Sequence, residues 1–131
     1  MIAFDTNLLV RYLTEDDKAQ CEKVDGLIKR HSGEDAIFLS NIVLVETEWV
    51  LHSVYGFSPK EIHHALDTIV SIGQFAFKDR ELIKHALQKY HDGIHDFSDC
   101  LIGEDGKYMH AKTYTFDKQL RKDNNFIVVE P

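Results

Sequence analysis

The sequence has few of the residues that mark export, disulfide scaffolds or membrane spans. It contains two cysteines, Cys21 and Cys100, which lie far apart and outside any Cys/His motif. No apolar run approaches the roughly 18 residues of a membrane-spanning helix, and no basic stretch opens the chain as it would a signal peptide. We therefore expect a cytoplasmic protein that does not enter the membrane, with reduced and packed thiols.

Positive charge is scarce as well. Fifteen Lys and Arg residues face 22 Asp and Glu residues, which gives a net charge of −7. A module that binds nucleic acid mainly by neutralising phosphates should be basic, so the charge argues against one. It remains compatible with a metal nuclease, because divalent cations neutralise carboxylates and then contact phosphate. It is also compatible with a basic protein partner.

Linkers, repeats and low-complexity tracts are absent, so we expect a single domain over residues 1–131. Short apolar runs alternate with segments of helical periodicity. The predicted strands are residues 2–4, 37–39, 75–77, 113–115 and 126–129. The predicted helices are residues 8–13, 17–30, 42–55, 59–70, 79–90 and 96–108, with a short helix after Asp117. This alternation predicts an α/β fold, a three-layer α/β/α sandwich with a central, mainly parallel sheet.

Two acids lie just beyond the carboxyl ends of predicted strands. Asp5 comes after the first strand, and Asp117 follows the strand 113–115. Each can cap the next helix by accepting a backbone N–H, and for Asp5 alone the cap is the simpler interpretation. The carboxyl ends of parallel strands are also where α/β sheets bind ligands. Thr115 could hydrogen-bond a ligating carboxylate or a water there.

A third acidic position opens the helix 96–108. Asp96 has the spacing of a helix cap, and Asp99 shares a helical face with Gly103 and Gly106. Each glycine inside a helix costs roughly 1 kcal/mol relative to alanine, so this face indicates close approach of another element. We interpret Asp99 as functional and Asp96 as a cap, with Asp96 also retained as a secondary ligand.

The fourth candidate lies on the helix 42–55, which is apolar nearly all round and is therefore expected to be buried. A buried carboxylate needs a partner or a metal, and periodicity alone does not choose between Glu46 and Glu48. The histidines show no metal-ligand spacing; we expect most to be solvated and assign none to the site. A centre of carboxylates without His or Cys favours Mg²⁺ or Mn²⁺.

In these residues the chain resembles PIN domains, specifically the VapC-type toxins of bacterial and archaeal toxin–antitoxin pairs. The resemblance covers nearly the whole chain and rests on four blocks, residues 4–9, 44–51, 96–102 and 115–117. It implies that the catalytic, metal-binding acids are Asp5, Glu46, Asp99 and Asp117. It thus selects Glu46 over Glu48, and it implies supporting roles for Asn7 and Thr115.

The same resemblance implies the reaction and the partners. The expected activity is hydrolysis of RNA phosphodiesters by a water that one or two Mg²⁺ or Mn²⁺ ions activate. A cognate antitoxin and a homodimer are the implied partners. Lys118 and Arg121 are candidates for RNA contact, although a solvated helix face explains them equally well. Glu104 and Asp105 depart from the small apolar residues usual in the family, and either solvation or an altered contact would account for them.

Two other functions remain open on the residues alone. One is a receiver-like or dehalogenase-like phosphoryl-transfer domain, which also places an Asp at a strand end; Asn7 stands where a dehalogenase needs its second acid. The other is a PIN-like interaction domain whose acids are only helix caps.

Overall fold

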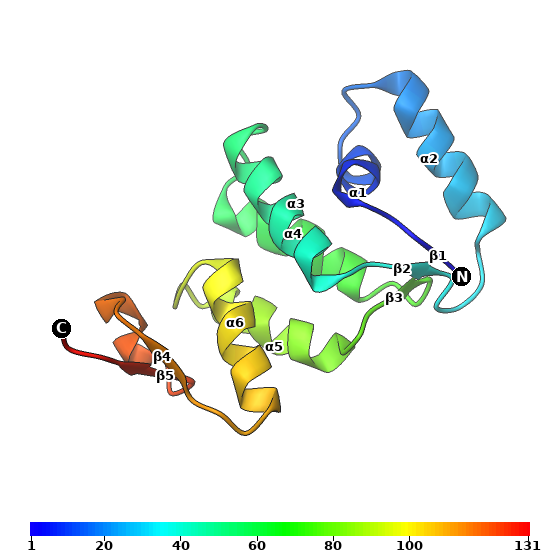
Figure 1. The fold of residues 1–131 in the computed structure, drawn as a ribbon. Coiled ribbons are helices and arrows are strands. Elements are labelled where there is room, and N and C mark those ends of the chain that lie inside the picture. The colour runs from blue at the N-terminus through cyan, green and yellow to red at the C-terminus, as the bar shows by residue number, and fades with distance from the viewer. The chain divides into compact units, whose positions relative to one another are not determined.

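Strands of two or three residues alternate with longer helices along the chain (Figure 1). The computed structural model describes residues 1–131 and divides into two units, Met1–Lys78 and Asp79–Pro131. None of the helices has the length and apolar character needed to cross a membrane.

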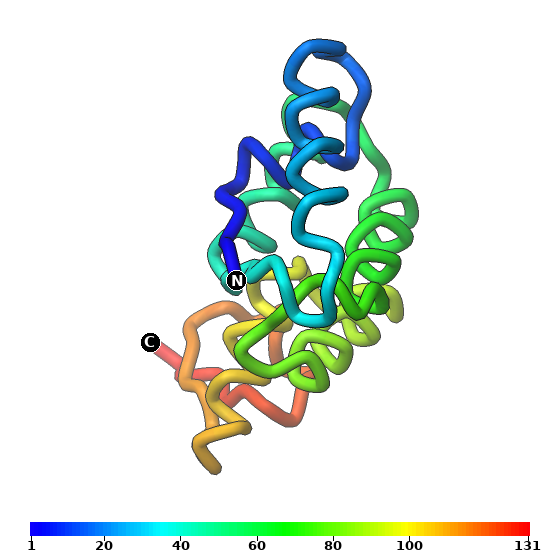
Figure 2. Tube along the Cα trace, turned by 90° about the vertical axis from the view of Figure 1, so that its right-hand side faces the viewer, coloured from blue at the N-terminus to red at the C-terminus, as the bar shows by residue number.

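The first unit is built around a parallel three-stranded sheet. Its elements are β1 (Ile2–Ala3), α1 (Thr6–Leu13), α2 (Lys18–Arg30), β2 (Ile37–Phe38), α3 (Asn41–Ser53), α4 (Pro59–Val70) and β3 (Phe75–Ala76). The strand order is β1-β2-β3, and every pairing is parallel. Figure 2 follows this part of the chain from blue to green, with each strand separated from the next by a pair of helices.

Side-chain caps start the helices of this unit where the sequence predicts them. Ser58 and Glu61 form a reciprocal capping box at α4, with Pro59 in the first turn. Ser40 caps α3 by accepting the Val43 N–H. Phe75 of β3 lies fully buried and receives the edges of the Phe4 and Tyr12 rings.

The second unit pairs two helices with a small sheet. It comprises α5 (Arg80–His91), α6 (Phe97–Tyr108), β4 (Thr113–Thr115), the 3-10 helix η1 (Lys118–Lys122) and β5 (Phe126–Val128). Strands β4 and β5 pair in parallel. A Cβ atom on Gly103 would lie 2.7 Å from the Phe126 ring, and one on Gly106 would lie 2.6 Å from Thr113 Oγ1. The glycines of α6 therefore let both strands approach the helix closely, as the sequence predicts.

The α/β class and the parallel pairing of the strands are confirmed. The single domain over residues 1–131 remains a prediction.

The expectation that α3 is buried nearly all round is wrong for one face. Leu44, Thr47 and Leu51 are fully buried, whereas Ile42 and Trp49 are 71% and 63% exposed. Apolar composition alone did not reveal that only part of this helix packs within its unit.

Candidate metal centre

The first acid, Asp5, lies between β1 and α1. Its Oδ1 atom accepts the Leu8 backbone N–H at 3.1 Å, so the residue is the N-cap of α1. The carboxylate is exposed, and its second oxygen accepts no hydrogen bond within the chain. Asp5 therefore caps the helix with one oxygen and presents the other to solvent.

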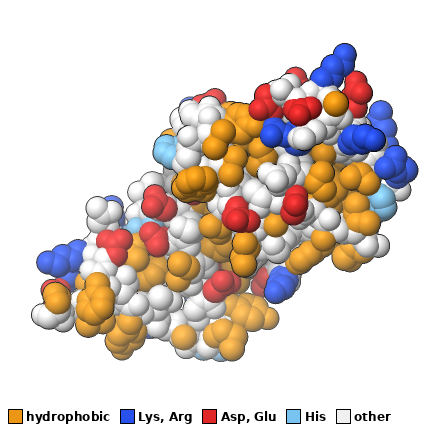
Figure 3. Space-filling view, turned by 45° about the horizontal axis from the view of Figure 1, so that its top comes forward, with side chains coloured by type: hydrophobic (Ala, Val, Ile, Leu, Met, Phe, Trp, Pro, Cys, Tyr) orange, Lys and Arg blue, Asp and Glu red, His pale blue; other side chains and the backbone are white.

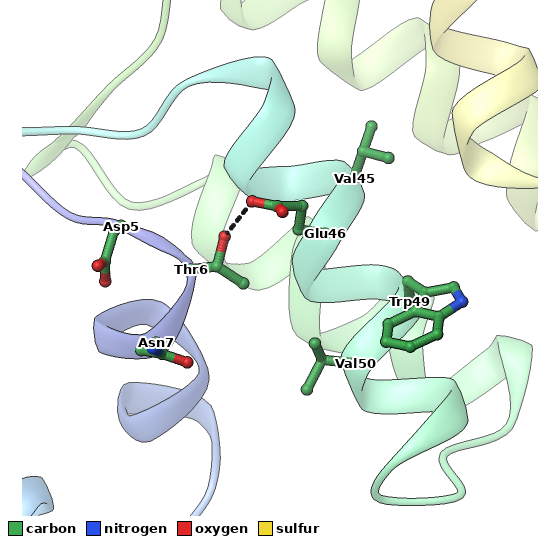
Figure 4. Close-up of a pocket in the computed structure, with 7 residues that line it drawn as sticks. All are labelled: Asp5, Thr6, Asn7, Val45, Glu46, Trp49 and Val50. Atoms are coloured by element: carbon green, nitrogen blue, oxygen red, sulfur yellow. Dashed lines mark hydrogen bonds between the residues drawn. The ribbon is translucent and has the colours of Figure 1, made fainter.

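Glu46 lies on α3 and faces the start of α1. Its Oε1 atom accepts a 2.7 Å hydrogen bond from the Thr6 hydroxyl. Asp5, Thr6, Asn7 and Glu46 line an open pocket of about 630 Å³, together with the α3 residues Val45, Trp49 and Val50. In Figure 4, Thr6 and Glu46 point toward each other, and Asp5 lies on the far side of Thr6. Glu46, not Glu48, is the α3 acid in this pocket.

Thr6 is a residue that the sequence interpretation missed. It occupies the first position of α1, where Asp5 already supplies the cap. A hydroxyl at that position is not needed for capping. A hydrogen-bond donor next to Asp5 without a capping role was therefore the signal in the sequence that Thr6 could bind another group. Thr6 fixes one oxygen of Glu46 while the other carboxylate oxygen stays available.

The second unit brings together Asp96, Asp99 and Asp117. Burial raises the pKa of the partly buried Asp99, the negative charges of Asp96 and Asp117 raise it further, and His95 acts in the opposite direction. The charges of the three carboxylates are therefore coupled. Such mutual repulsion is what a bound cation would relieve.

Asp96 does not cap α6 as predicted. It occupies the N-cap position, and its carbonyl accepts the Cys100 N–H, but its side chain makes no capping hydrogen bond. The carboxylate is instead exposed beside Asp99. This geometry strengthens the case for Asp96 as a secondary ligand.

Asp117 repeats the arrangement of Asp5 at the end of β4. Its Oδ1 atom accepts the Gln119 N–H at 2.9 Å and caps η1, while its own N–H donates to Thr115 Oγ1 at 3.0 Å. The Thr115 hydroxyl thus holds the backbone of Asp117, whereas a bond to the carboxylate or to a water was expected.

Comparison with known proteins assigns the family. The sequence model of the PIN domain matches residues 2–123, a span that includes all four predicted acids. The chain belongs to the PIN domain family. Among solved structures it is similar to the crystal structure of Mycobacterium tuberculosis VapC20, a sarcin-ricin loop cleaving toxin, with 19% identity, a TM-score of 0.45 and 100% of both chains covered. No curated protein sequence matches it.

The donor set of this PIN domain suits a hard divalent cation. The predicted ligands offer only carboxylate oxygens, which Mg²⁺ and Mn²⁺ prefer. Asp5 and Glu46 share a pocket in the first unit, and Asp99 and Asp117 are coupled by charge in the second. No three His, Cys, Asp or Glu side chains are grouped as a metal site on their own. The acids therefore fit the ion in the chemistry of their donor atoms.

The cations predicted to contact RNA lie on η1, next to Asp117. Lys118 is exposed. The Arg121 guanidinium pairs with Glu130 at 2.6 Å, and both side chains are 62% exposed. An exposed ion pair contributes little and exchanges readily, so Arg121 can still turn to a phosphate. Figure 3 shows acidic and apolar side chains interspersed on the face drawn there, in keeping with the acidic composition.

Most of the histidines are exposed, as expected, but His95 and one of the two extra acids of α6 are buried. His95 is not solvated: its side chain is 2% exposed, and its ring meets Phe126 edge-on. Glu104 is likewise buried and lies 3.8 Å from the Lys89 ammonium. Asp105, in contrast, is exposed. In the sequence Glu104 stands next to Asp105, which carries the same charge. No local pattern indicates that the Lys89 ammonium of α5 lies beside it.

The two cysteines are free, as expected. Cys100 is fully buried, and burial raises the pKa of its thiol to about 12. A thiol of this kind stays protonated at neutral pH, so it is inert in catalysis.

Proposed function

We propose that this PIN domain is a metal-dependent endoribonuclease and the toxin of a type II toxin–antitoxin pair, related to the VapC-type toxins. The observation that carries the proposal is the set of acids within the family match: Asp5 and Glu46 line one pocket, and Asp99 and Asp117 are coupled by charge.

In this proposal the acids hold one or two Mg²⁺ or Mn²⁺ ions, with Asp5 and Asp99 as the main ligands and Glu46 and Asp117 completing the set. The metal supplies a water of lowered pKa and charge compensation at the scissile phosphate. The protein's own contribution is to fix the carboxylates. Thr6 orients Glu46 through its hydroxyl, and the Thr115 hydroxyl fixes the backbone of Asp117.

The remaining polar residues bind the substrate. Asn7 lines the same pocket as Asp5 and offers an amide to a phosphate or a water. Lys118 and Arg121 lie on the helix that Asp117 caps, close along the chain to the metal ligands. We propose that they neutralise phosphates flanking the cleaved bond, as basic side chains do in nucleic-acid interfaces.

The partners follow from the same proposal. A net charge of −7 suits a basic antitoxin segment, whose cationic side chain would meet the acids of the site. Exposed apolar side chains on α3, Ile42 and Trp49 among them, offer area for a protein interface such as a homodimer. We place this toxin in the cytoplasm, where its RNA substrate is.

The first test is RNA cleavage by the purified chain with Mn²⁺. We expect cleavage that EDTA abolishes and that Asp5→Asn reduces by at least a hundredfold, because the substitution removes a ligand charge. Asp25→Asn, at an exposed acid on α2, is the matched control and should cleave like the wild type.

Two results would contradict the proposal. One is cleavage that persists in Asp5→Asn, which would indicate a contaminating nuclease. The other is a stable aspartyl phosphate after incubation with acetyl phosphate, which would indicate a phosphoryl-transfer domain. A chain that cleaves no RNA under any of these conditions would instead fit a non-catalytic PIN-like interaction domain.

A further inference from the structure

The second unit contains a buried charged cluster that the proposed function does not use. It consists of Lys89 on α5, His95 before α6, Glu104 on α6 and Asp123 after η1. The side chain of Asp123 is fully buried, and those of Glu104 and His95 are 5% and 2% exposed. Burying such groups is costly even when they are paired. Their presence therefore calls for a role beyond filling the core.

Asp123 is the centre of this cluster. Its Oδ1 atom accepts hydrogen bonds from Lys89 Nζ at 2.7 Å and from the Asn125 N–H at 2.9 Å. Its Oδ2 atom lies 3.7 Å from His95 Nε2, and both atoms are buried without any other partner. Burial would raise the pKa of Asp123, but these hydrogen bonds and the nearby positive charge lower it overall. The buried group is thus a carboxylate.

The cluster connects two segments that carry site residues. His95 directly precedes Asp96, and the first turn of α6 then presents Asp99. Asp123 directly follows η1, the helix that Asp117 caps. The carboxylate of Asp123 therefore faces His95 before α6, while the backbone N–H of the same residue donates to the Leu120 carbonyl at the end of η1, at 3.0 Å.

The acids on these segments repel one another. Asp96 and Asp99 stand at the start of α6 and Asp117 at the start of η1, so like charges face each other between these segments when all three are ionised. An anchored connection between the two segments resists their separation. Lys89 supplies the anchor, because it donates from a third element, α5, to the same carboxylate.

We propose that Asp123 is a positioning residue for the metal centre, which sets the spacing of Asp99 and Asp117 through His95, Lys89 and the turn into β5. This inference rests on the proposed function, since the spacing matters only if the two acids share metal binding. Asp123 itself touches neither metal nor RNA. It keeps the two ligands close enough to share a cation despite their repulsion.

Glu104 offers a control that distinguishes this positioning role from a purely structural role of the cluster. It is also a buried carboxylate within reach of Lys89, at 3.8 Å, but it lies on the body of α6 and forms no hydrogen bond or ion pair with His95 or with η1. Asp123→Asn and Glu104→Gln each remove one buried negative charge beside the same ammonium. Only the first weakens the connection between the segments that carry Asp99 and Asp117.

The experiment measures Mn²⁺ binding to the full chain without RNA, by the electron paramagnetic resonance signal of free Mn²⁺. We expect the wild type to bind Mn²⁺, Asp123→Asn to raise the dissociation constant at least tenfold, and Glu104→Gln to change it by less than twofold. Equal losses in both variants would show that the cluster only stabilises the fold. An unchanged affinity in Asp123→Asn would also overturn the positioning role.

A second variant covers the case in which Asp123→Asn does not fold, as judged by circular dichroism. His95→Phe keeps a ring against Phe126 and leaves both hydrogen bonds to Asp123 Oδ1 in place, but it removes the contact to Oδ2. We expect at least a threefold weaker affinity for Mn²⁺, and an unchanged value would refute the inference. A wild type that binds no Mn²⁺ would instead contradict the proposed function itself, and with it the positioning role.

Discussion

At the scale of single residues, two of the four acids of the candidate centre make a capping hydrogen bond with one carboxylate oxygen and leave the other oxygen available. Asp5 and Asp117 each use Oδ1 to cap the following helix. From sequence, cap and ligand look like competing explanations of the same residue. The structure shows that they are compatible, because a carboxylate has two oxygens and the cap occupies only one.

Asp99 gives a prediction about pH. Its folded-state pKa lies above the ordinary 3.8, owing to burial first and then to the charges of Asp96 and Asp117. The folded protein therefore holds this proton more tightly than the unfolded chain does. The contribution of Asp99 to stability grows as the pH falls through the raised pKa, levels off near the unfolded value, and is unfavourable at pH 7.

We expect Asp99→Asn to melt at a higher temperature than the wild type at pH 7 with EDTA present. The difference should shrink as the pH is lowered toward about 3, below the unfolded-state pKa, where the wild-type carboxyl is mostly protonated in both states. Thermal melts followed by circular dichroism measure this, with Asp25→Asn as the control. A variant that melts below the wild type at pH 7 would show that the repulsion at Asp99 is unimportant.

At the scale of elements, the sequence predicted the helices and strands to within two residues at every boundary. Capping residues made this possible: Ser58 with Glu61, Ser40 and Asp79 all act as local signals and all cap in the structure. The side chain of Asp96 is the exception, because a position in the chain does not determine whether a side chain turns toward its own helix.

The glycine face of α6 gives a prediction at this scale. Alanine in place of a helical glycine is usually favourable by up to about 1 kcal/mol. At Gly103, however, the added Cβ would lie 2.7 Å from the Phe126 ring, which is itself packed against His95. We expect Gly103→Ala to lower the free energy of unfolding by about 1 kcal/mol or more, because overpacking outweighs helix propensity.

Gly26 on α2 provides the matched control. A Cβ atom there would meet only the flexible guanidinium of Arg30, at 3.3 Å. We expect Gly26→Ala to raise the free energy of unfolding by about 0.5–1 kcal/mol. Urea unfolding of both variants measures the difference. A stabilised Gly103→Ala would mean that β5 does not need its close approach to α6.

At the scale of the whole molecule, a concentration of acids without metal is expected to limit stability. The net charge is −7, and in the second unit burial and then the acidic neighbours raise the pKa of Asp99. A ligand that binds only the folded state stabilises it by about 2.7 kcal/mol at a hundred times its dissociation constant. For a chain of this size such a gain raises the melting temperature on the order of 10 °C.

We therefore expect saturating Mg²⁺ or Mn²⁺ to raise the melting temperature of the wild type. Asp5→Asn or Asp99→Asn should lose most of that rise, whereas Asp25→Asn should retain it. Differential scanning calorimetry with and without the ion measures the shift. A melting curve that the metal leaves unchanged would count against the carboxylate centre, whatever the outcome of the cleavage assay.

The sequence by itself determined the α/β class, the order of the elements, the PIN resemblance and the choice of acids. These depend on local rules of periodicity, capping and motif spacing, which act between residues close in the chain. The metal-binding role of the four acids and the three-layer arrangement stay predictions.

Only the tertiary structure decided how those acids are supported. It paired the Thr6 hydroxyl with Glu46, forty positions away, and Lys89 with Asp123, thirty-four positions away. It also left the Asp96 carboxylate beside Asp99 without a capping hydrogen bond. The side chains of His95 and Glu104 became buried. Such contacts depend on which side chains the packed elements bring within a few ångströms, and no local pattern along the chain specifies that distance.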